Sequence, residues 1–263
     1  LGDVYKRQEE YEPSSEYDSS FALQIFAARE AVFKILAKES LSIHEKLIVI
    51  LDMGSKIQQC INTDEYDNIK SVVNDYLKEG IAHTLDETRN LSDSGQFEDI
   101  SLQQGIRQIL YPYEEMEVLN PEWEVILKDI IDSLFEQMSD EEYNILNEEF
   151  GTYMVSRAYE YRQLLEYLVF RYFAKSIYDY DFLGKCQMLV TNFFVIRQMD
   201  IIRWLDNHRE YSFKDRMDVV HIFSRQVEYS EDNIENLYED FIFDDIFKTD
   251  SLIAILWIDS ENI

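Results

Sequence analysis

Basic side chains interrupt an apolar and aromatic stretch over residues 161–205, and these are the residues of the chain best suited to bind a ligand. Tyr167, Arg171 and Tyr178 lie four and seven residues apart, so they share one face of a helix. Arg197 lies in the next predicted helix, and a buried guanidinium needs a carboxylate partner or a bound anion. These four residues predict a polar pocket, lined by hydroxyl and guanidinium groups, that holds a carboxylate-bearing ligand.

A purely structural role is the alternative for the same arginines. Each would then pair with a nearby carboxylate, for example that of Glu166 or Asp200, among tyrosines that belong to the core. Asp218 and His221 form a further acid–histidine combination, but such pairs on a helix surface are usually simple electrostatic contacts. The chain has no Gly-rich phosphate loop, no nucleophile elbow and no HExxH motif, so the sequence assigns no catalytic residue and no metal site.

Charge and cysteine content limit the partners and the compartment. Lys and Arg number 24 against 53 Asp and Glu, a formal charge of -29 that repels nucleic acid and anionic lipid. The longest uncharged run, residues 186–196, is far shorter than the roughly 20 residues of a membrane-spanning helix. Cys60 and Cys186 occur in different predicted helices without a CxxC pair, so we expect two buried, reduced thiols in a cytoplasmic protein.

Helices must position these side chains, because the chain contains only 7 Gly and 3 Pro and no run of alternating apolar and polar residues. We therefore predict an all-α fold, an irregular multi-helix array around one core. A central pair of long helices is expected over residues 153–178 and 179–208. Apolar residues at helical spacing predict further helices over residues 21–36, 42–61, 64–91 (interrupted near Gly80) and 100–117 (kinked or ended by Pro112).

Capping side chains predict where several helices begin. Asn120 precedes Pro121, which suits the first turn because its missing N–H has no partner there anyway. Ser139 and Glu142 form a capping box. Further helix starts are predicted at Ser212 (with Asp215), Ser230 and Asp250.

One helical domain is predicted over residues 21–258, which the loop 90–99 could subdivide. Residues 9–20 are acidic and Ser-rich, so we expect a linker or loop there, and residues 259–263 are expected to form a tail. Residues 1–8 are expected to be an artefact. Part of this segment, DVYKRQ, can be encoded by GAT GTG TAT AAG AGA CAG, the end sequence of a widely used transposon-based sequencing adapter, and the native chain would then continue upstream.

Five segments resemble the C-terminal helical region of the bacterial flagellin lysine-N-methylases, and the likeness covers nearly all of residues 18–254. Their order and approximate spacing agree with that family, and the specificity comes from their number and order. The segments are AREAVFKIL (28–36), VLNPEW (118–123), YLVFRYFAKSIYD (167–179), FFVIRQMDIIRWL (193–205) and FSRQVEYSEDNIENLYE (223–239).

The resemblance implies a parent enzyme that transfers methyl groups from S-adenosylmethionine to lysine side chains of flagellin. It also implies an N-terminal cysteine-rich region with an iron–sulfur or similar metal centre, which has no counterpart among the 263 residues. We therefore expect this fragment to be inactive by itself. The cofactor's carboxylate would suit Arg171 or Arg197. The alternative function is a non-enzymatic, acidic helical domain that binds another protein.

Overall fold

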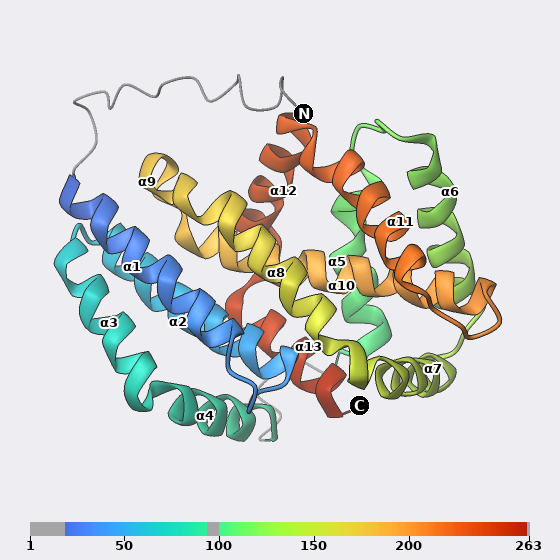
Figure 1. Cartoon of the computed structure of the whole chain (residues 1–263), viewed down its shortest axis with the longest axis horizontal. Helices are drawn as coiled ribbons and strands as arrows, with labels where there is room; N and C mark the ends of the chain where they lie inside the picture. The colour runs from blue at the N-terminus through green and yellow to red at the C-terminus, as the bar shows by residue number, and fades with distance from the viewer. Residues whose placement is uncertain (1–18, 94–99, 262–263) are drawn as a thin grey trace.

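The computed structural model describes residues 19–93 and 100–261, and all regular elements within these ranges are helical (Figure 1). The predicted all-α array is thereby confirmed. No helix in the described ranges is long and apolar enough to cross a membrane. The α-helices are α1 (Ser19–Leu36), α2 (Ile43–Asn62), α3 (Ile69–Asp75), α4 (Ile81–Asp93), α5 (Leu102–Glu114), α6 (Pro121–Ile130), α7 (Asp140–Met154), α8 (Ala158–Tyr172), α9 (Ser176–Asp179), α10 (Phe182–Asp206), α11 (Phe213–Phe223), α12 (Glu231–Phe243) and α13 (Thr249–Glu261).

Helix α10 forms the centre of the array. It is 25 residues long and buried almost all round, and it packs against α2, α5, α6, α8 and α11. A helix that is apolar on every side belongs in a core. Helix α10 comes close to α2 at Gly54, because a Cβ atom there would lie 2.5 Å from Cys186 Sγ. Helix α13 covers another side of α2 (Figure 1).

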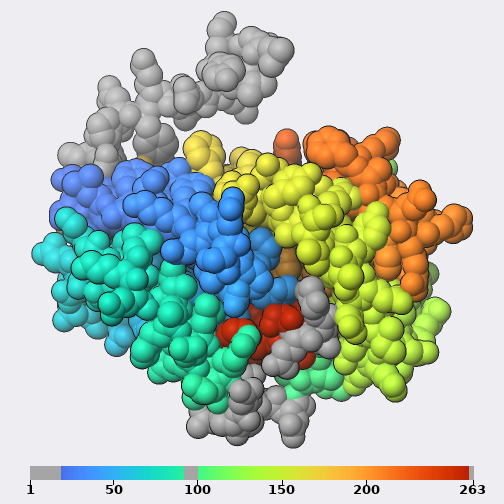
Figure 2. All heavy atoms as spheres, turned by 60° about the horizontal axis from the view of Figure 1, so that its bottom comes forward, coloured from blue at the N-terminus to red at the C-terminus, as the bar shows by residue number. Residues whose placement is uncertain are grey.

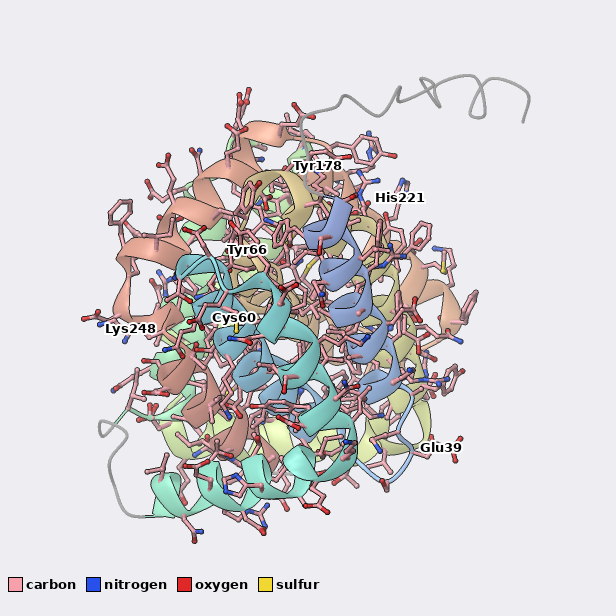
Figure 3. The ribbon with its side chains drawn as sticks, turned by 90° about the vertical axis from the view of Figure 1, so that its left-hand side faces the viewer. Glu39, Cys60, Tyr66, Tyr178, His221 and Lys248 are labelled. Atoms are coloured by element: carbon pink, nitrogen blue, oxygen red, sulfur yellow. The ribbon has the colours of Figure 1, made fainter. Side chains whose placement is uncertain are left out.

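The two cysteines lie in the helices α2 and α10 and are free thiols, as predicted. Cys60 lies in α2 (Figure 3) and Cys186 in α10, and both are buried. Burial raises the pKa of each thiol, so both favour the protonated form.

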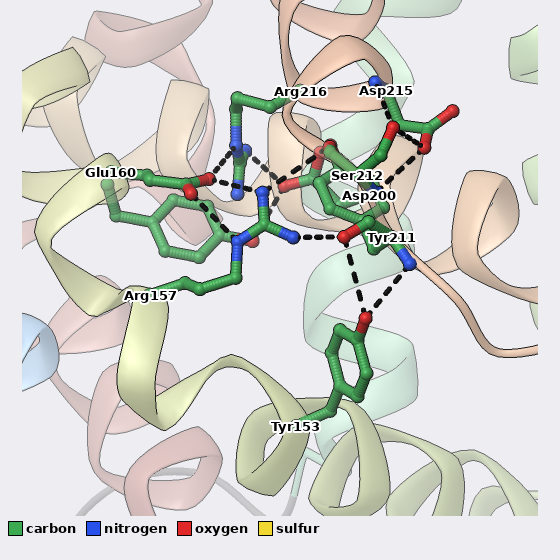
Figure 4. Close-up of polar contacts among 9 residues, drawn as sticks. Tyr153, Arg157, Glu160, Asp200, Tyr211, Ser212, Asp215 and Arg216 are labelled. Atoms are coloured by element: carbon green, nitrogen blue, oxygen red, sulfur yellow. Dashed lines mark hydrogen bonds and ion pairs between the residues drawn. The ribbon is translucent and has the colours of Figure 1, made fainter.

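The partner of α10 is shorter than predicted. The 3₁₀ turns Val155–Arg157 and Phe173–Lys175 separate α8 from α7 and α9, so the bounds 153–178 were wrong. Residues 152–183 contain neither Gly nor Pro, and no local signal marks these breaks. At least one break coincides with a tertiary contact, because the Arg157 guanidinium donates a hydrogen bond to the backbone carbonyl of Tyr211 (Figure 4).

Local capping signals predicted most helix starts correctly. Predicted N-caps that accept a backbone hydrogen bond are Asn120, Ser139, Ser212 and Ser230. The predicted helix start at Asp250 was wrong. Helix α13 begins at Thr249, and the Leu252 N–H donates to the carbonyl of Lys248. Asp250 therefore lies inside the first turn, where its negative charge stabilises the helix by interacting with the helix dipole.

Two predicted irregularities also occur. A π-helical turn over Tyr76–Gly80 joins α3 to α4, at the predicted interruption near Gly80. Pro112 lies inside α5, which ends two residues later at Glu114. Since proline lacks an N–H and clashes with the preceding turn, it is tolerated only near the end of this helix.

The expected segment boundaries agree less well. Ser19 and Ser20 belong to α1 and not to a linker, and α4 extends to Asp93, into the predicted loop 90–99. Asp259 lies in α13 with 2 % exposure, so the predicted tail begins too early. The expected adapter segment 1–8, most of the linker, residues 94–99 and the last two residues lie outside the described ranges.

Candidate functional site

An apolar pocket with a volume of about 240 Å³ lies between the start of α2, the end of α7, the start of α8 and the middle of α10. Phe150, Met154 and Phe193 form part of its apolar wall. Val155 also lines it and is 64 % exposed, which places the mouth of the pocket at the turn between α7 and α8. The polar side chains at the wall include His44, Tyr161 and Arg197.

The first turn of α2 brings His44 to this wall. Ser42 and Glu45 form a capping box: Ser42 Oγ accepts from the Glu45 N–H at 3.1 Å, and the Glu45 carboxylate accepts from the Ser42 N–H at 2.8 Å. Reciprocal capping of this kind fixes the residue at which a helix begins. His44 consequently has a defined position, and it is only 6 % exposed.

A buried polar network joins His44 to the last helix. His44 Nε2 lies 2.7 Å from Asp259 Oδ2, and Asn147 Nδ2 donates to Asp259 Oδ1 at 2.5 Å. Arg197 donates to both the side-chain and the backbone oxygen of Asn147, and its Nη2 lies 3.9 Å from Asp259 Oδ1. Four helices, α2, α7, α10 and α13, therefore meet at one carboxylate.

The charges in this network determine its protonation. Burial alone would raise the pKa of Asp259, but the nearby Arg197 guanidinium and the hydrogen bonds from His44 and Asn147 outweigh burial and hold this pKa well below its usual range. An ionised carboxylate only accepts hydrogen bonds, so the proton between the two groups resides on His44 Nε2. In the neutral imidazole the lone pair is then on Nδ1, and no hydrogen bond to Nδ1 is found within the described ranges.

A second buried network includes Glu160, Asp200 and Arg216 (Figure 4), and the hydroxyl of Tyr161 takes part in it. The Tyr161 hydroxyl donates to Asp200 Oδ2 at 2.7 Å, and Asp200 also accepts from Tyr211 and from Arg216. Arg216 Nε lies 3.1 Å from Glu160 Oε2, and the Arg157 guanidinium binds the same carboxylate. Two guanidinium groups thus balance two carboxylates, and the hydroxyl proton of Tyr161 is committed to Asp200.

Two of the predicted site residues meet at a different place, around Glu228. Tyr167 donates to Glu228 Oε2 at 2.9 Å, and Arg171 Nε lies 3.0 Å from the same oxygen. Tyr172, which the sequence did not suggest, adds a third contact at 3.2 Å. Arg171 therefore forms an internal ion pair, but its partner is Glu228 and not Glu166. Its side chain remains 45 % exposed.

The other two predicted residues lie apart from this cluster. Tyr178 is 56 % exposed and lies near the N-terminal end of α1 (Figure 3), where Tyr180 stacks on Phe21 with ring centroids 4.9 Å apart. Arg197 lines the apolar pocket, whereas Tyr178 does not. The partners of Arg197 are Asn147 and Asp259 and not Asp200. The structure does not bring the four residues into one pocket, and their role in binding stays a prediction.

His44 and Asp259 were not among the residues predicted for the site. They are 215 residues apart, so no local spacing could relate them, and Asp259 was assigned to a tail. The available signal was the Ser42–Glu45 spacing, which fixes the start of α2 and hence the position of His44.

The size of the pocket favours one side chain over a whole cofactor. A dry cavity of about 150 Å³ can hold a benzene molecule, whereas pockets for drug-sized ligands measure roughly 300–1,000 Å³. At about 240 Å³ the pocket does not fit a molecule that carries both a nucleoside and an amino acid, such as S-adenosylmethionine. Among the residues that the structure describes, no group of three or more His, Cys, Asp or Glu is arranged to hold a metal ion.

Comparison with known proteins agrees with the resemblance seen in the sequence. The model of the family described as the FliB lysine N-methylase C-terminal domain matches residues 29–255. Neither the search of the curated proteins nor that of the solved structures found a match. The matched range contains α2, α7, α8 and α10, which form the pocket, and ends shortly before Asp259. The chain therefore belongs to the FliB lysine N-methylase family, and residues 29–255 are its C-terminal domain.

Proposed function

We propose that this chain is the C-terminal part of an S-adenosylmethionine-dependent methylase that modifies flagellin lysines in the cytoplasm, and that its apolar pocket receives the target lysine. The single observation that supports this role is the apolar pocket with Arg197 at its wall. The methylene stem of a lysine suits such a wall. Methyl transfer needs a neutral amine, and both burial and a nearby guanidinium lower the pKa of an amine.

The distribution of charge between the surface and the pocket supports the same role for the pocket. The formal charge of -29 attracts a lysine-bearing segment to the surface of the protein. The pocket itself is apolar, so it favours the uncharged form of the side chain once it has entered. The acidic surface thus attracts the charged lysine, and the apolar pocket then favours loss of its proton.

We propose that the methyl donor binds outside this apolar pocket. S-adenosylmethionine supplies an electrophilic methyl group, and the pocket is too small for the whole molecule. We also propose that the cysteine-rich region implied by the resemblance carries the iron–sulfur or similar centre. The 263 residues alone are then expected not to transfer methyl groups.

The test is a pocket-filling substitution in the complete enzyme. Ala158 lines the pocket at the start of α8, so the Ala158→Phe ring is expected to occupy the space of the lysine stem. Ser156→Phe is the matched control, because Ser156 is exposed in the preceding turn and does not line the pocket. The enzymes are prepared anaerobically with flagellin and S-adenosylmethionine, and methylated lysines are counted by mass spectrometry. Methylation by Ala158→Phe at the level of the control would refute the pocket assignment.

Exposed apolar side chains favour a second candidate function, a non-enzymatic domain that binds another protein. Helix α12 follows Tyr229, which is 76 % exposed, and ends with Ile242 and Phe243, which are 75 % and 78 % exposed. Large exposed apolar side chains are typical of surfaces that contact partners. Ile242→Ser with Phe243→Ser is expected to abolish flagellin binding under this alternative, whereas pocket variants would leave binding unchanged.

A further inference from the structure

His44 is a buried histidine whose protein contacts use one ring nitrogen. Its Nε2 atom lies 2.7 Å from Asp259 Oδ2, and no described residue forms a hydrogen bond with Nδ1. The ring meets Phe193 edge-on, with centroids 5.4 Å apart, and both residues line the pocket. His44 Nδ1 is not one of the fully buried side-chain atoms that lack a partner in the described ranges, so it is open to solvent or to a ligand in the pocket. An accessible lone pair at the wall of an apolar pocket suits a ligand that donates a proton.

The groups around His44 leave its imidazole as the available base. Asp259, from α13, is ionised and already accepts from His44 and Asn147. Arg197, from α10, is a cation and accepts no proton. Tyr161, from α8, has its hydroxyl committed to Asp200. Within α2 itself, the Glu45 carboxylate is engaged by the helix cap at Ser42.

We propose that His44 is the proton acceptor for the amine that enters this pocket. The side chain of a lysine arrives as an ammonium ion, one N–H bond at Nζ breaks, and the proton moves to the lone pair of His44 Nδ1. The products are a neutral amine, which keeps the electron pair of the broken bond, and an imidazolium ion. Asp259 is a positioning residue that holds the tautomer and stabilises the imidazolium. The inference rests on the proposed function of the pocket.

Ordinary pKa values decide whether this transfer is feasible. In water a lysine amine has a pKa of about 10.4 and imidazole one of about 6.5, so the transfer is unfavourable by a factor of about 10⁴. Burial can lower the pKa of an amine by about 3–5, and the cationic Arg197 acts in the same direction. An apolar pocket with Arg197 at its wall can therefore bring the pKa of a bound amine down toward that of an ordinary imidazole.

The test uses n-butylamine, which is the side chain of lysine without its backbone, and n-butanol as an uncharged isostere. Binding to the 263-residue chain is measured calorimetrically at pH 8 in buffers of different ionisation enthalpy, which reports the protons exchanged with the buffer. At this pH the amine is charged and a free imidazole is neutral. We expect wild-type protein to bind the amine without releasing a proton to the buffer, because His44 accepts it.

The His44→Gln variant separates the base from the pocket. We expect it to bind n-butanol as wild type does, but to bind the amine at least 10-fold more weakly and with release of about one proton per ligand. His83→Gln is the matched control, since His83 forms an exposed pair with Glu87, with Nδ1 3.4 Å from Oε2, and does not line the pocket. Equal amine binding by His44→Gln and wild type would overturn the role of His44 while leaving the pocket assignment intact. If neither probe binds wild type, the pocket assignment fails and the inference with it.

A second readout comes from the complete enzyme. A general base typically contributes a factor of about 10²–10⁴, so His44→Gln should slow flagellin methylation by that factor near neutral pH. The loss should shrink as the pH rises toward the pKa of a free lysine, because the amine then needs no base. A loss that is the same at every pH would indicate a structural role and contradict the inference.

Discussion

Replacing Asp259 by Asn is expected to destabilise the fold, although residue 259 lies near the end of the chain. Asn keeps the size and one acceptor oxygen of the side chain but removes the negative charge that compensates Arg197. Asp259 is 2 % exposed and Arg197 3 %, so water cannot replace the lost partner. His44 loses its ionised acceptor as well.

Removal of one member of a buried ion pair typically costs about 3–5 kcal/mol. The lower end applies here, because Arg197 keeps both hydrogen bonds to Asn147 and its Nη2 is 3.9 Å from the carboxylate. For a domain of this size, 1 kcal/mol corresponds to about 2–4 °C in Tm. We therefore expect Asp259→Asn to lower the Tm of the chain by about 6–12 °C at pH 7.

The sign of the pH dependence follows from the same residue. The pKa of Asp259 is lower in the folded protein than in the unfolded chain, where it is about 3.9. Its contribution to the free energy of unfolding is therefore fully present above about pH 5 and is lost as the pH falls below 4. The gap in Tm between wild type and Asp259→Asn should narrow over that acidic range.

Thermal unfolding followed by circular dichroism measures this effect, and Asp245→Asn provides the control. Asp245 forms a 2.5 Å ion pair with Lys248 just before α13, but the two side chains are 85 % and 69 % exposed. Such surface pairs contribute little to stability, so the Tm of Asp245→Asn should be close to that of wild type. Equal Tm shifts for the two variants at pH 7 would refute the buried network as a source of stability.

Three further predictions concern packing, thiol chemistry and the Glu228 cluster. Gly54→Ala forces a Cβ atom against Cys186 Sγ, so it should lower the free energy of unfolding in urea by about 1–3 kcal/mol, and Cys186→Ala should restore part of that loss. Iodoacetamide at neutral pH should modify Cys60 and Cys186 only slowly in the native chain and rapidly in urea, as followed by mass spectrometry, because burial raises the pKa of both thiols. Arg171→Ala should lower the Tm more than Arg171→Ala combined with Glu228→Gln, because the single variant leaves a nearly buried carboxylate without its cation; the reverse order would contradict the ion pair.

The features that the sequence predicted correctly depend on residues close together in the chain. The capping pairs at Ser139 and Ser212 use side chains three residues apart, and the Pro112 effect lies within one helix. Such local signals can be interpreted without the tertiary structure, because capping residues and prolines act on the nearest helical turn.

The pocket could not be found in this way, because its polar wall depends on pairs that only the tertiary fold creates. Arg197 at this wall has its hydrogen-bond acceptors in α7 and its carboxylate partner in α13. Outside the pocket, Arg171 likewise pairs with Glu228 of a π-helical turn distant in sequence. The sequence correctly indicated that buried arginines need partners. In a chain with 53 acidic residues, however, it could not indicate which carboxylates those partners are.

The contact between the first and last parts of the chain has a consequence for synthesis of the protein. His44 and Asp259 are separated by 215 residues, and at roughly 5–20 residues per second the ribosome needs about 10–40 s to make the intervening chain. During that time α2 exists without α13, which covers part of it in the finished fold; in Figure 2 the end of α13, in red, is visible between α4 and α7. The nascent chain must keep an apolar surface of α2 from aggregating until α13 has been synthesised, which makes chaperone binding during synthesis an expected requirement of this fold.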